Sequence, residues 1–121
     1  MPLTYVCSPL SAPTRAEVLS NAAKAVSYMT MAEQEFGDRS VAPHAYLPYL
    51  LDDGVPEERA LALEFGQKLL AMCSRLVVYG PRISNGMRGE IEAARQLGIP
   101  ILYRQAIGGM EDAMQICGRQ V

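Results

Sequence analysis

Residues 74–103 carry the pattern of a strand, a loop, a helix and a second strand. Two continuously apolar runs, 76–79 and 99–103, flank a helical stretch that begins near Ser84. That spacing suits a crossover between parallel strands, and continuous apolar runs are typical of parallel strands buried on both faces. The helix stripe that should face the sheet comprises Met87, Ile91, Ala94 and Gly98. The pattern predicts a parallel βαβ unit.

Glu90 is a carboxylate that pairing along this helix does not explain. No Lys or Arg stands three or four positions away, whereas Glu92 has Arg88 and Arg95 at those spacings and is expected to be a solvated surface group. Glu90 should lie near a helix N-terminus, beyond the carboxyl end of a parallel strand, where open α/β sheets bind ligands. Two interpretations stay open: a site carboxylate, or one that only complements the helix dipole.

Length and composition limit the class of protein. The chain has 121 residues, 50% hydrophobic and 20% charged, which predicts one globular domain over residues 1–121. A net charge of −2 without a basic run argues against a nucleic-acid polymer as partner. No run is long and apolar enough to cross a membrane, and the N-terminus lacks a signal-peptide layout.

Cysteine and histidine usage bears on redox state and metal binding. The 3 cysteines show no CxxC spacing, so we expect reduced thiols in a cytoplasmic protein. The chain has 1 histidine, so we expect no metal site.

Two elements are predicted before residue 40. Residues 3–7 form an apolar, β-favouring run, which a Ser/Pro-rich loop at 8–13 follows. Thr14 or Ser11 can cap the next helix, whose apolar positions recur at helical spacing up to about residues 36–37.

The middle of the chain is predicted to hold a short strand, a loop and a helix. Residues 40–43 form a brief strand that ends in proline. The loop 44–49 carries His44 and two tyrosines; it either lines a pocket that touches a ligand or is a packed aromatic loop with a structural histidine. A helix begins at 53–58, and its stripe of Leu61, Phe65, Leu69 and Met72 is expected to pack on the sheet. Residues 110–116 could form a last short helix.

The order β-α-β-α-β-α-β predicts a three-layer α/β/α, flavodoxin-like fold. Its parallel sheet would have four to five strands in the order 2-1-3-4(-5), with a switch point between strands one and three. That order places the loops 8–13 and 80–85 beside the approach to His44, with Tyr5 close by. The fingerprints GxGxxG, GxxxxGK[ST] and GxSxG are missing, and we expect no cofactor.

Three stretches together resemble the nucleoside 2-deoxyribosyltransferase superfamily: YVCSPL at 5–10, SNGMRGEI at 84–91 and GIPI at 98–101. Members look like Y-[LFV]-x-x-P near the start, D/S-x-G-[TM]-x-x-E-[IL] before a helix and G-[KI]-P-[IV] on the last common strand. A small, often phage-associated branch of that group also resembles the chain in CSPL, APHAYLP and ISNGM.

The resemblance implies an active site. Glu90 matches the family's nucleophile, which attacks C1′ of a deoxyribonucleoside as the base leaves, and Tyr5 matches the tyrosine beside it. Ser84 stands where transferases have an aspartate and where monophosphate hydrolases have a serine that meets the phosphate. The residues implied in substrate binding are Ser8, Pro9, Ser11, His44, Ser84, Asn85, Gly86 and Met87. Arg82 and Arg88 could add charge.

One departure bears on catalysis. The family's usual aspartate that helps the leaving base is replaced by Ser74-Arg75, and only Asp52, Asp53 or His44 could substitute for it.

Three hypotheses about function remain. The first is an N-glycosidase or deoxyribosyltransferase acting on deoxynucleosides or their 5′-monophosphates, in a homo-oligomer. The second is a non-catalytic nucleotide-binding or sensing module. The third is a small interaction protein with a vestigial crevice.

Overall fold

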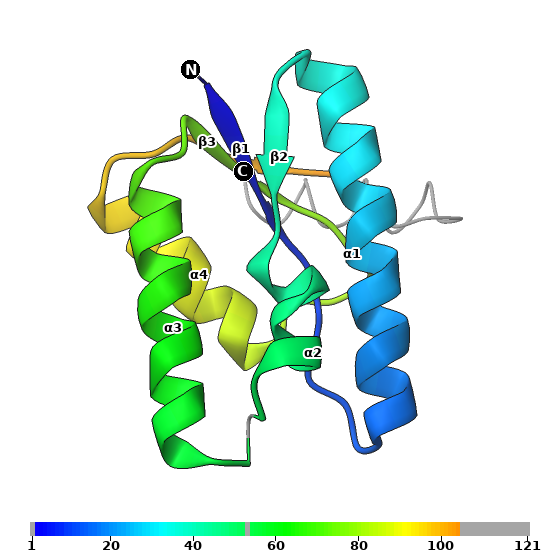
Figure 1. Cartoon of the computed structure of the whole chain (residues 1–121). Helices are drawn as coiled ribbons and strands as arrows, with labels where there is room; N and C mark the ends of the chain where they lie inside the picture. The colour runs from blue at the N-terminus through cyan, green and yellow to red at the C-terminus, as the bar shows by residue number, and fades with distance from the viewer. Residues whose placement is uncertain (1, 53, 105–121) are drawn as a thin grey trace.

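The chain folds around a four-stranded parallel sheet in the described residues. A computed structural model describes residues 2–52 and 54–104 (Figure 1). The strands are β1 (Leu3–Cys7), β2 (Arg39–Val41), β3 (Arg75–Val78) and β4 (Ile101–Tyr103). All neighbours pair in parallel, in the order β2-β1-β3-β4. The predicted order 2-1-3-4 and its switch point between β1 and β3 are confirmed.

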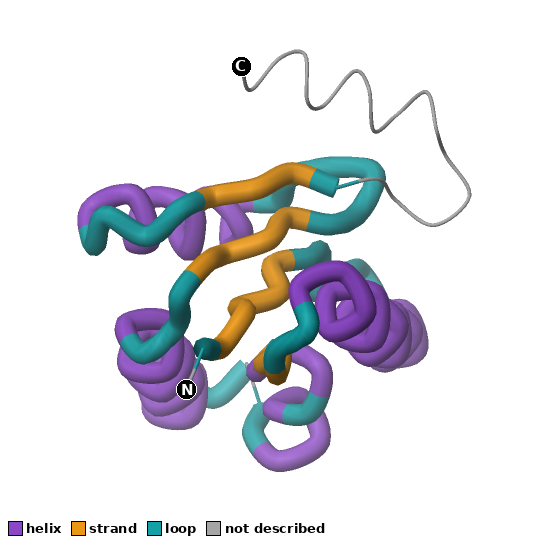
Figure 2. Tube along the Cα trace, turned by 90° about the horizontal axis from the view of Figure 1, so that it is seen from above, coloured by secondary structure: helices purple, strands orange, loops and turns teal. Residues whose placement is uncertain are grey.

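Helices cover both faces of this sheet (Figure 2). Helix α1 (Arg15–Phe36) buries Ala25, Tyr28 and Ala32 against the face that presents Val6 and Val77. The opposite face carries α3 (Pro56–Ala71) and α4 (Asn85–Gln96).

The two faces use alternate residues of the same strands, as the pleat requires. Tyr5, Cys7 and Leu76 belong to the core beneath α3 and α4, together with Met87 and Ala94 of α4. The expected three-layer arrangement and the burial of both sheet faces are therefore confirmed.

Local capping sets the helix boundaries. The Thr14 side chain accepts a hydrogen bond from the Glu17 N–H at 3.2 Å, and Gly37 ends α1 at a φ of 75°. Ser84 caps α4 by accepting from the Met87 N–H at 3.3 Å. Glu92 pairs with Arg95 on the exposed side of α4 at 2.9 Å, as its spacing predicted.

Helix α3 turns a different side to the sheet from the one predicted. Leu70 is buried, and the adjoining inward positions are Ala62, Gly66 and Leu69. The predicted stripe instead leaves Leu61, Phe65 and Met72 exposed by 54%, 45% and 68%. Two apolar stripes lie side by side on this helix, and the one with small residues allows the closer approach.

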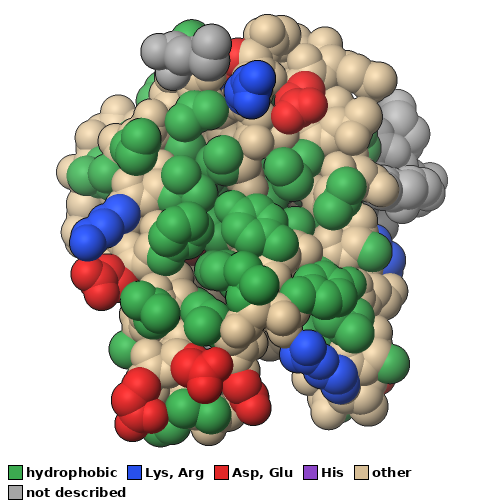
Figure 3. All heavy atoms as spheres, in the orientation of Figure 1, with side chains coloured by type: hydrophobic (Ala, Val, Ile, Leu, Met, Phe, Trp, Pro, Cys, Tyr) green, Lys and Arg blue, Asp and Glu red, His purple; other side chains and the backbone are tan. Residues whose placement is uncertain are grey.

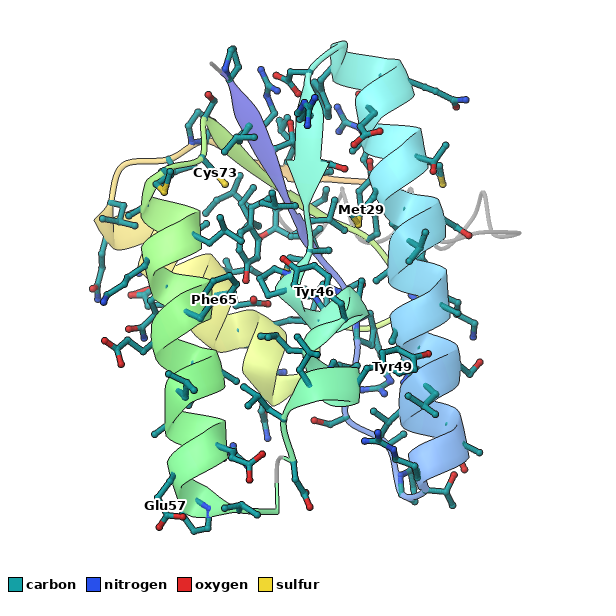
Figure 4. The ribbon with its side chains drawn as sticks, in the orientation of Figure 1. Met29, Tyr46, Tyr49, Glu57, Phe65 and Cys73 are labelled. Atoms are coloured by element: carbon teal, nitrogen blue, oxygen red, sulfur yellow. The ribbon has the colours of Figure 1, made fainter. Side chains whose placement is uncertain are left out.

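The exposed stripe of α3 belongs to a larger apolar surface. Figure 3 shows hydrophobic side chains gathered across the face between α3 and α1. Figure 4 shows Phe65 on the same side of the molecule as Tyr46 and Tyr49, which are themselves 39% and 60% exposed.

Residues 43–50 form helical turns where a loop was predicted. A 3₁₀ turn, η1 (Pro43–Ala45), precedes the one-turn helix α2 (Leu47–Leu50). Each has a proline in its first two positions, where its fixed φ suits a helix and its missing N–H costs nothing. The predicted helix at 110–116 lies outside the described residues. No helix in the described ranges has the length and apolarity to cross a bilayer.

Candidate active site

A cavity of about 590 Å³ opens at the carboxyl ends of the strands. It unites segments far apart in sequence: the loop after β1, the turn η1 after β2, and the start of α4 after β3. The predicted site residues that line it are Tyr5, Ser8, Ser11, His44, Ser84, Asn85, Gly86, Met87 and Glu90. Their roles stay predictions, but the structure brings them together.

Pro9 does not line the cavity and instead holds two of its loops together. Gly80 has a φ of 109°, and a Cβ added there would lie 2.7 Å from Cδ of Pro9. Only glycine combines that backbone with so close an approach. The contact seats the loop that carries Ser8 and Ser11 directly against the loop before α4.

Glu90 receives a hydrogen bond on each carboxylate oxygen. The Tyr5 hydroxyl donates to Oε2, and the Cys7 thiol donates to Oε1 at 3.4 Å. Burial raises the pKa of Glu90, while the Tyr5 and Cys7 hydrogen bonds act to lower it. The net direction is upward, so burial outweighs the two hydrogen bonds.

The donors of Glu90 stay protonated. Burial, followed by the Glu90 charge, raises the pKa of Tyr5 far above its usual value. The same two causes raise the pKa of Cys7 well above 9.0. Glu90 has no ion-pair partner among the described residues. A partly buried carboxylate held by neutral donors at a cavity wall can act as a nucleophile or transfer a proton.

His44 and Ser8 form a second polar pair in the cavity. The Ser8 hydroxyl and Nε2 of His44 are 2.7 Å apart. Burial lowers the pKa of His44 to about 4, so its ring is neutral at neutral pH. A neutral imidazole and a hydroxyl can bind sugar hydroxyls by exchanging donor and acceptor roles.

Several polar residues of the cavity went unrecognised in the sequence. Arg15 of α1 and Arg59 and Gln67 of α3 line it, although no motif marked them. Arg15 follows the cap Thr14 at the edge where ligands were expected, which is the one signal that was available. The cysteine pattern predicts only a reduced thiol at Cys7, yet its position two residues after Tyr5 places both on the same face of β1.

The two arginines expected to add charge lie elsewhere. Arg82 reaches the carbonyl of Ser11 at 3.5 Å and does not line the cavity. Arg88 borders a separate small hollow beside Tyr103. Arg15 and Arg59 are therefore the cations of the described cavity wall.

The position of Ser74-Arg75 also differs from what a catalytic acid would need. Arg75 begins β3, at the amino end of the sheet, and pairs with Asp38 at 2.6 Å. Neither Ser74 nor Arg75 lines the cavity, whereas Asp52 does. Asp53 lies outside the described residues. No group of three or more His, Cys, Asp or Glu that could hold a metal occurs in the ranges 2–52 and 54–104.

Comparison with known proteins finds one family and a structural relative. The model of a family described as "Domain of unknown function (DUF7768)" matches residues 2–104. A solved 2-deoxyribosyltransferase from the psychrotolerant bacterium Bacillus psychrosaccharolyticus has a similar fold, with a TM-score of 0.62 over 85% of this chain and 72% of that chain. The sequences are 18% identical, so this likeness shows the fold alone. No curated protein matches the chain.

Proposed function

The chain belongs to the family described as a domain of unknown function (DUF7768), and we propose that it cleaves the base–deoxyribose bond of deoxynucleosides or their 5′-monophosphates. Glu90 is the proposed nucleophile. The base would leave as Glu90 attacks, and water or a second base would then take the deoxyribosyl group from Glu90. The likeness to a 2-deoxyribosyltransferase supports nucleoside-related glycosyl transfer at the level of the fold.

The observation that carries this proposal is the setting of Glu90. Its carboxylate lies at a cavity on the carboxyl edge of a parallel sheet and makes no ion pair in the described structure. A carboxylate kept only for stability would more often face water or a cation. Burial instead raises its pKa, which is the environment of a reactive group.

The proposed reaction has two displacements at C1′. An oxygen of Glu90 attacks C1′ and forms a glycosyl ester, while the electron pair of the C1′–N bond leaves with the base, which takes a proton from water in the cavity. A water molecule or a second base then attacks C1′, gives its proton to the hydroxide left by the first step and releases the Glu90 carboxylate. Tyr5 would orient Glu90 through its hydroxyl and would recover the full hydrogen bond when the carboxylate is released.

Sugar and phosphate would be bound by the remaining polar wall. Ser8 and His44 suit the sugar hydroxyls, because their pair can both donate and accept. Ser11, Ser84 and the first N–H groups of α4, at Asn85 and Gly86, suit a 5′-phosphate. Arg15 and Arg59 would add positive charge at the same cavity.

A non-catalytic nucleotide-binding or sensing module is the second candidate. The position that would supply an acid to the leaving base is occupied by Arg75, which pairs with Asp38 and does not line the cavity. The loss of that acid favours binding without turnover. The carboxylates that line the described cavity are Asp52 and Glu90. Losing general-acid help costs roughly two to four orders of magnitude in rate. It does not remove the groups that bind the nucleotide, so the protein would still bind its ligand while turning it over very slowly.

We also propose that the chain acts as a homo-oligomer in the cytoplasm, on a small molecule rather than on a nucleic-acid polymer or a membrane. The exposed apolar side chains of α3 support self-association, because contiguous apolar surface of this kind usually marks an interface.

Base release tests the proposal. Purified protein is incubated with each deoxynucleoside and its 5′-monophosphate, with and without an acceptor base, and the products are separated by chromatography. Wild type runs beside Glu90→Gln and, as a matched control on the same helix, Glu92→Gln. We expect base release or exchange that Glu90→Gln abolishes and Glu92→Gln retains.

The alternative outcome is equally clear. No turnover with any substrate, together with a rise in melting temperature on adding a nucleotide, would refute the enzyme and favour the binding module.

A further inference from the structure

Cys7 and Tyr5 form a matched pair of donors on one strand. They stand two residues apart on β1, so both side chains point to the face covered by α3 and α4. Both are buried, with 0% and 2% of their surface exposed. Tyr5 reaches Oε2 of Glu90, and Cys7 reaches Oε1 at 3.4 Å. Both oxygens of one carboxylate are thus held by a single strand.

We infer that Cys7 is a positioning residue for Glu90: its thiol holds the second carboxylate oxygen and fixes the plane of the carboxylate against the cavity. The inference rests on the proposed function of Glu90 as a nucleophile. With Tyr5 alone, the carboxylate could rotate about its terminal bond, since that torsion is broad for glutamate. Two donors leave one orientation.

A thiol suits this task better than a hydroxyl. The S–H group is a weak donor, so it orients the carboxylate while withdrawing little of the charge that makes it nucleophilic. A stronger donor would stabilise the ion and lower its basicity.

Cys7 also has a second acceptor within reach. Its sulfur lies 3.9 Å from the carbonyl oxygen of Met87. Once Glu90 is esterified, its oxygens accept hydrogen bonds less well than a carboxylate does, and the thiol can turn to the Met87 carbonyl. The thiol hydrogen therefore keeps a partner in both states of the nucleophile, and no buried donor is left unsatisfied.

The competing explanation is packing, because a buried cysteine often serves only as a small apolar residue. The two explanations differ in what they predict for the titration of Glu90: a positioning thiol shifts its midpoint when replaced, and a packing residue does not.

Of the titratable side chains in the described structure, Tyr5 and Cys7 hydrogen-bond to Glu90, and Cys73 lies near Tyr5. The other charged or titratable groups that line the cavity are Arg15, His44, Asp52 and Arg59.

The test uses Cys7→Ala, Cys7→Ser and the control Cys73→Ser in the full chain. Cys73 is a buried thiol of the same core that bonds the Leu69 carbonyl at 3.3 Å instead of Glu90. Glu90 is titrated by ¹³C NMR on protein labelled at the glutamate carboxyl carbon, and Glu90→Gln identifies its resonance. The pH dependence of base release is measured on the same samples.

We expect opposite shifts from the two Cys7 variants. Cys7→Ala removes a donor, so the Glu90 midpoint and the acid limb of base release move up by about one pH unit or less. Cys7→Ser supplies a stronger donor, so both move down. The turnover number of Cys7→Ala should fall by roughly 10- to 100-fold with KM nearly unchanged, because orientation is lost and binding is kept. Cys73→Ser should leave the Glu90 midpoint in place.

An unchanged Glu90 midpoint in folded Cys7→Ala and Cys7→Ser would overturn the inference and leave packing as the role of Cys7. Opposite shifts with an unchanged turnover number would also overturn it. Because the titration needs no substrate, base release by the wild type judges the proposed function separately. Cys7→Ser is nearly the same size as the wild-type residue, so it keeps the test valid if Cys7→Ala fails to fold.

Discussion

Replacing Gly80 by alanine is expected to damage both stability and the site, whereas Gly37→Ala should cost much less. Both glycines have a positive φ, 109° at Gly80 and 75° at Gly37, so both substitutions force an L-residue into backbone that it rarely adopts. Their surroundings differ. An added Cβ at Gly80 meets Cδ of Pro9 at 2.7 Å, whereas one at Gly37 meets nothing within 4 Å.

The two costs can be separated. Left-handed backbone costs an L-residue roughly 1–2 kcal/mol, and both variants bear a cost of that order. Crowding of a packed contact adds roughly 1–3 kcal/mol, and only Gly80→Ala bears it, because the rigid ring of Pro9 cannot swing aside. The expected loss of unfolding free energy is therefore about 2–5 kcal/mol for Gly80→Ala and about 1–2 kcal/mol for Gly37→Ala.

Urea unfolding followed by circular dichroism measures both losses, and base release measures the effect on the site. Relief of the crowding must move the loop that bears Ser8 and Ser11 away from the loop before α4. We therefore expect Gly80→Ala to lose base release, or nucleotide-induced stabilisation, well beyond Gly37→Ala. Equal destabilisation and equal site function in the two variants would refute the role assigned to the Pro9–Gly80 contact.

Three further perturbations address the site and the surface. Tyr5→Phe keeps the buried ring but removes the donor to Glu90. The pKa of Glu90, already raised by burial, should rise further because the Tyr5 hydrogen bond lowers it, and the acid limb of base release should move to higher pH. His44 is the chain's 1 histidine, so its ring can be titrated by proton NMR. Burial lowers its pKa from 6.5 to about 4, so the folded state binds fewer protons and stability should fall as pH drops through that window; a midpoint near 6.5 would contradict this. Phe65→Lys, at a side chain 45% exposed, should change the unfolding free energy by less than about 0.5 kcal/mol yet lower the mass measured by sedimentation, and an unchanged mass would argue against α3 as the interface.

The fold could be predicted from sequence largely because its signals are local. The first strand was predicted at residues 3–7 and spans Leu3–Cys7. Of the two predicted caps, Thr14 and Ser11, the structure uses Thr14, and α1 ends at Gly37, within the predicted range of 36–37. A side-chain cap and a positive φ each have a residue preference, so both ends leave a local signal.

The orientation of α3 could not be predicted in the same way. Its two apolar stripes are equally helical in spacing, and the choice between them depends on how closely Ala62 and Gly66 let the helix approach the sheet. The turns at residues 43–50 were missed for a related reason: a single helical turn has no periodicity to detect.

In the candidate site, too, some residues could be predicted from local signals and others depend on how helices pack. The residues predicted at strand ends and helix starts lie together at the cavity, because strand order alone brings them together, and their roles stay predictions. The cavity walls contributed by Arg15 and Arg59 depend on how whole helices pack, and no local motif records that. Arg88 was expected to add charge at the site, but it lies at a separate hollow. It stands two residues before Glu90, so its side chain points about 200° around the helix from the carboxylate.

The hydrogen bonds to Glu90 close very long loops of the chain. Tyr5 and Cys7 lie 85 and 83 positions from it in sequence, so neither contact can form until β1 has paired with β3 and α4 has docked. Closing such loops costs entropy that only the assembled core offsets. A nascent or partly unfolded chain would therefore expose Glu90 to water as an ordinary, unoriented carboxylate. Reactivity of this group would be confined to the completed fold, and its titration would serve as a reporter of native assembly.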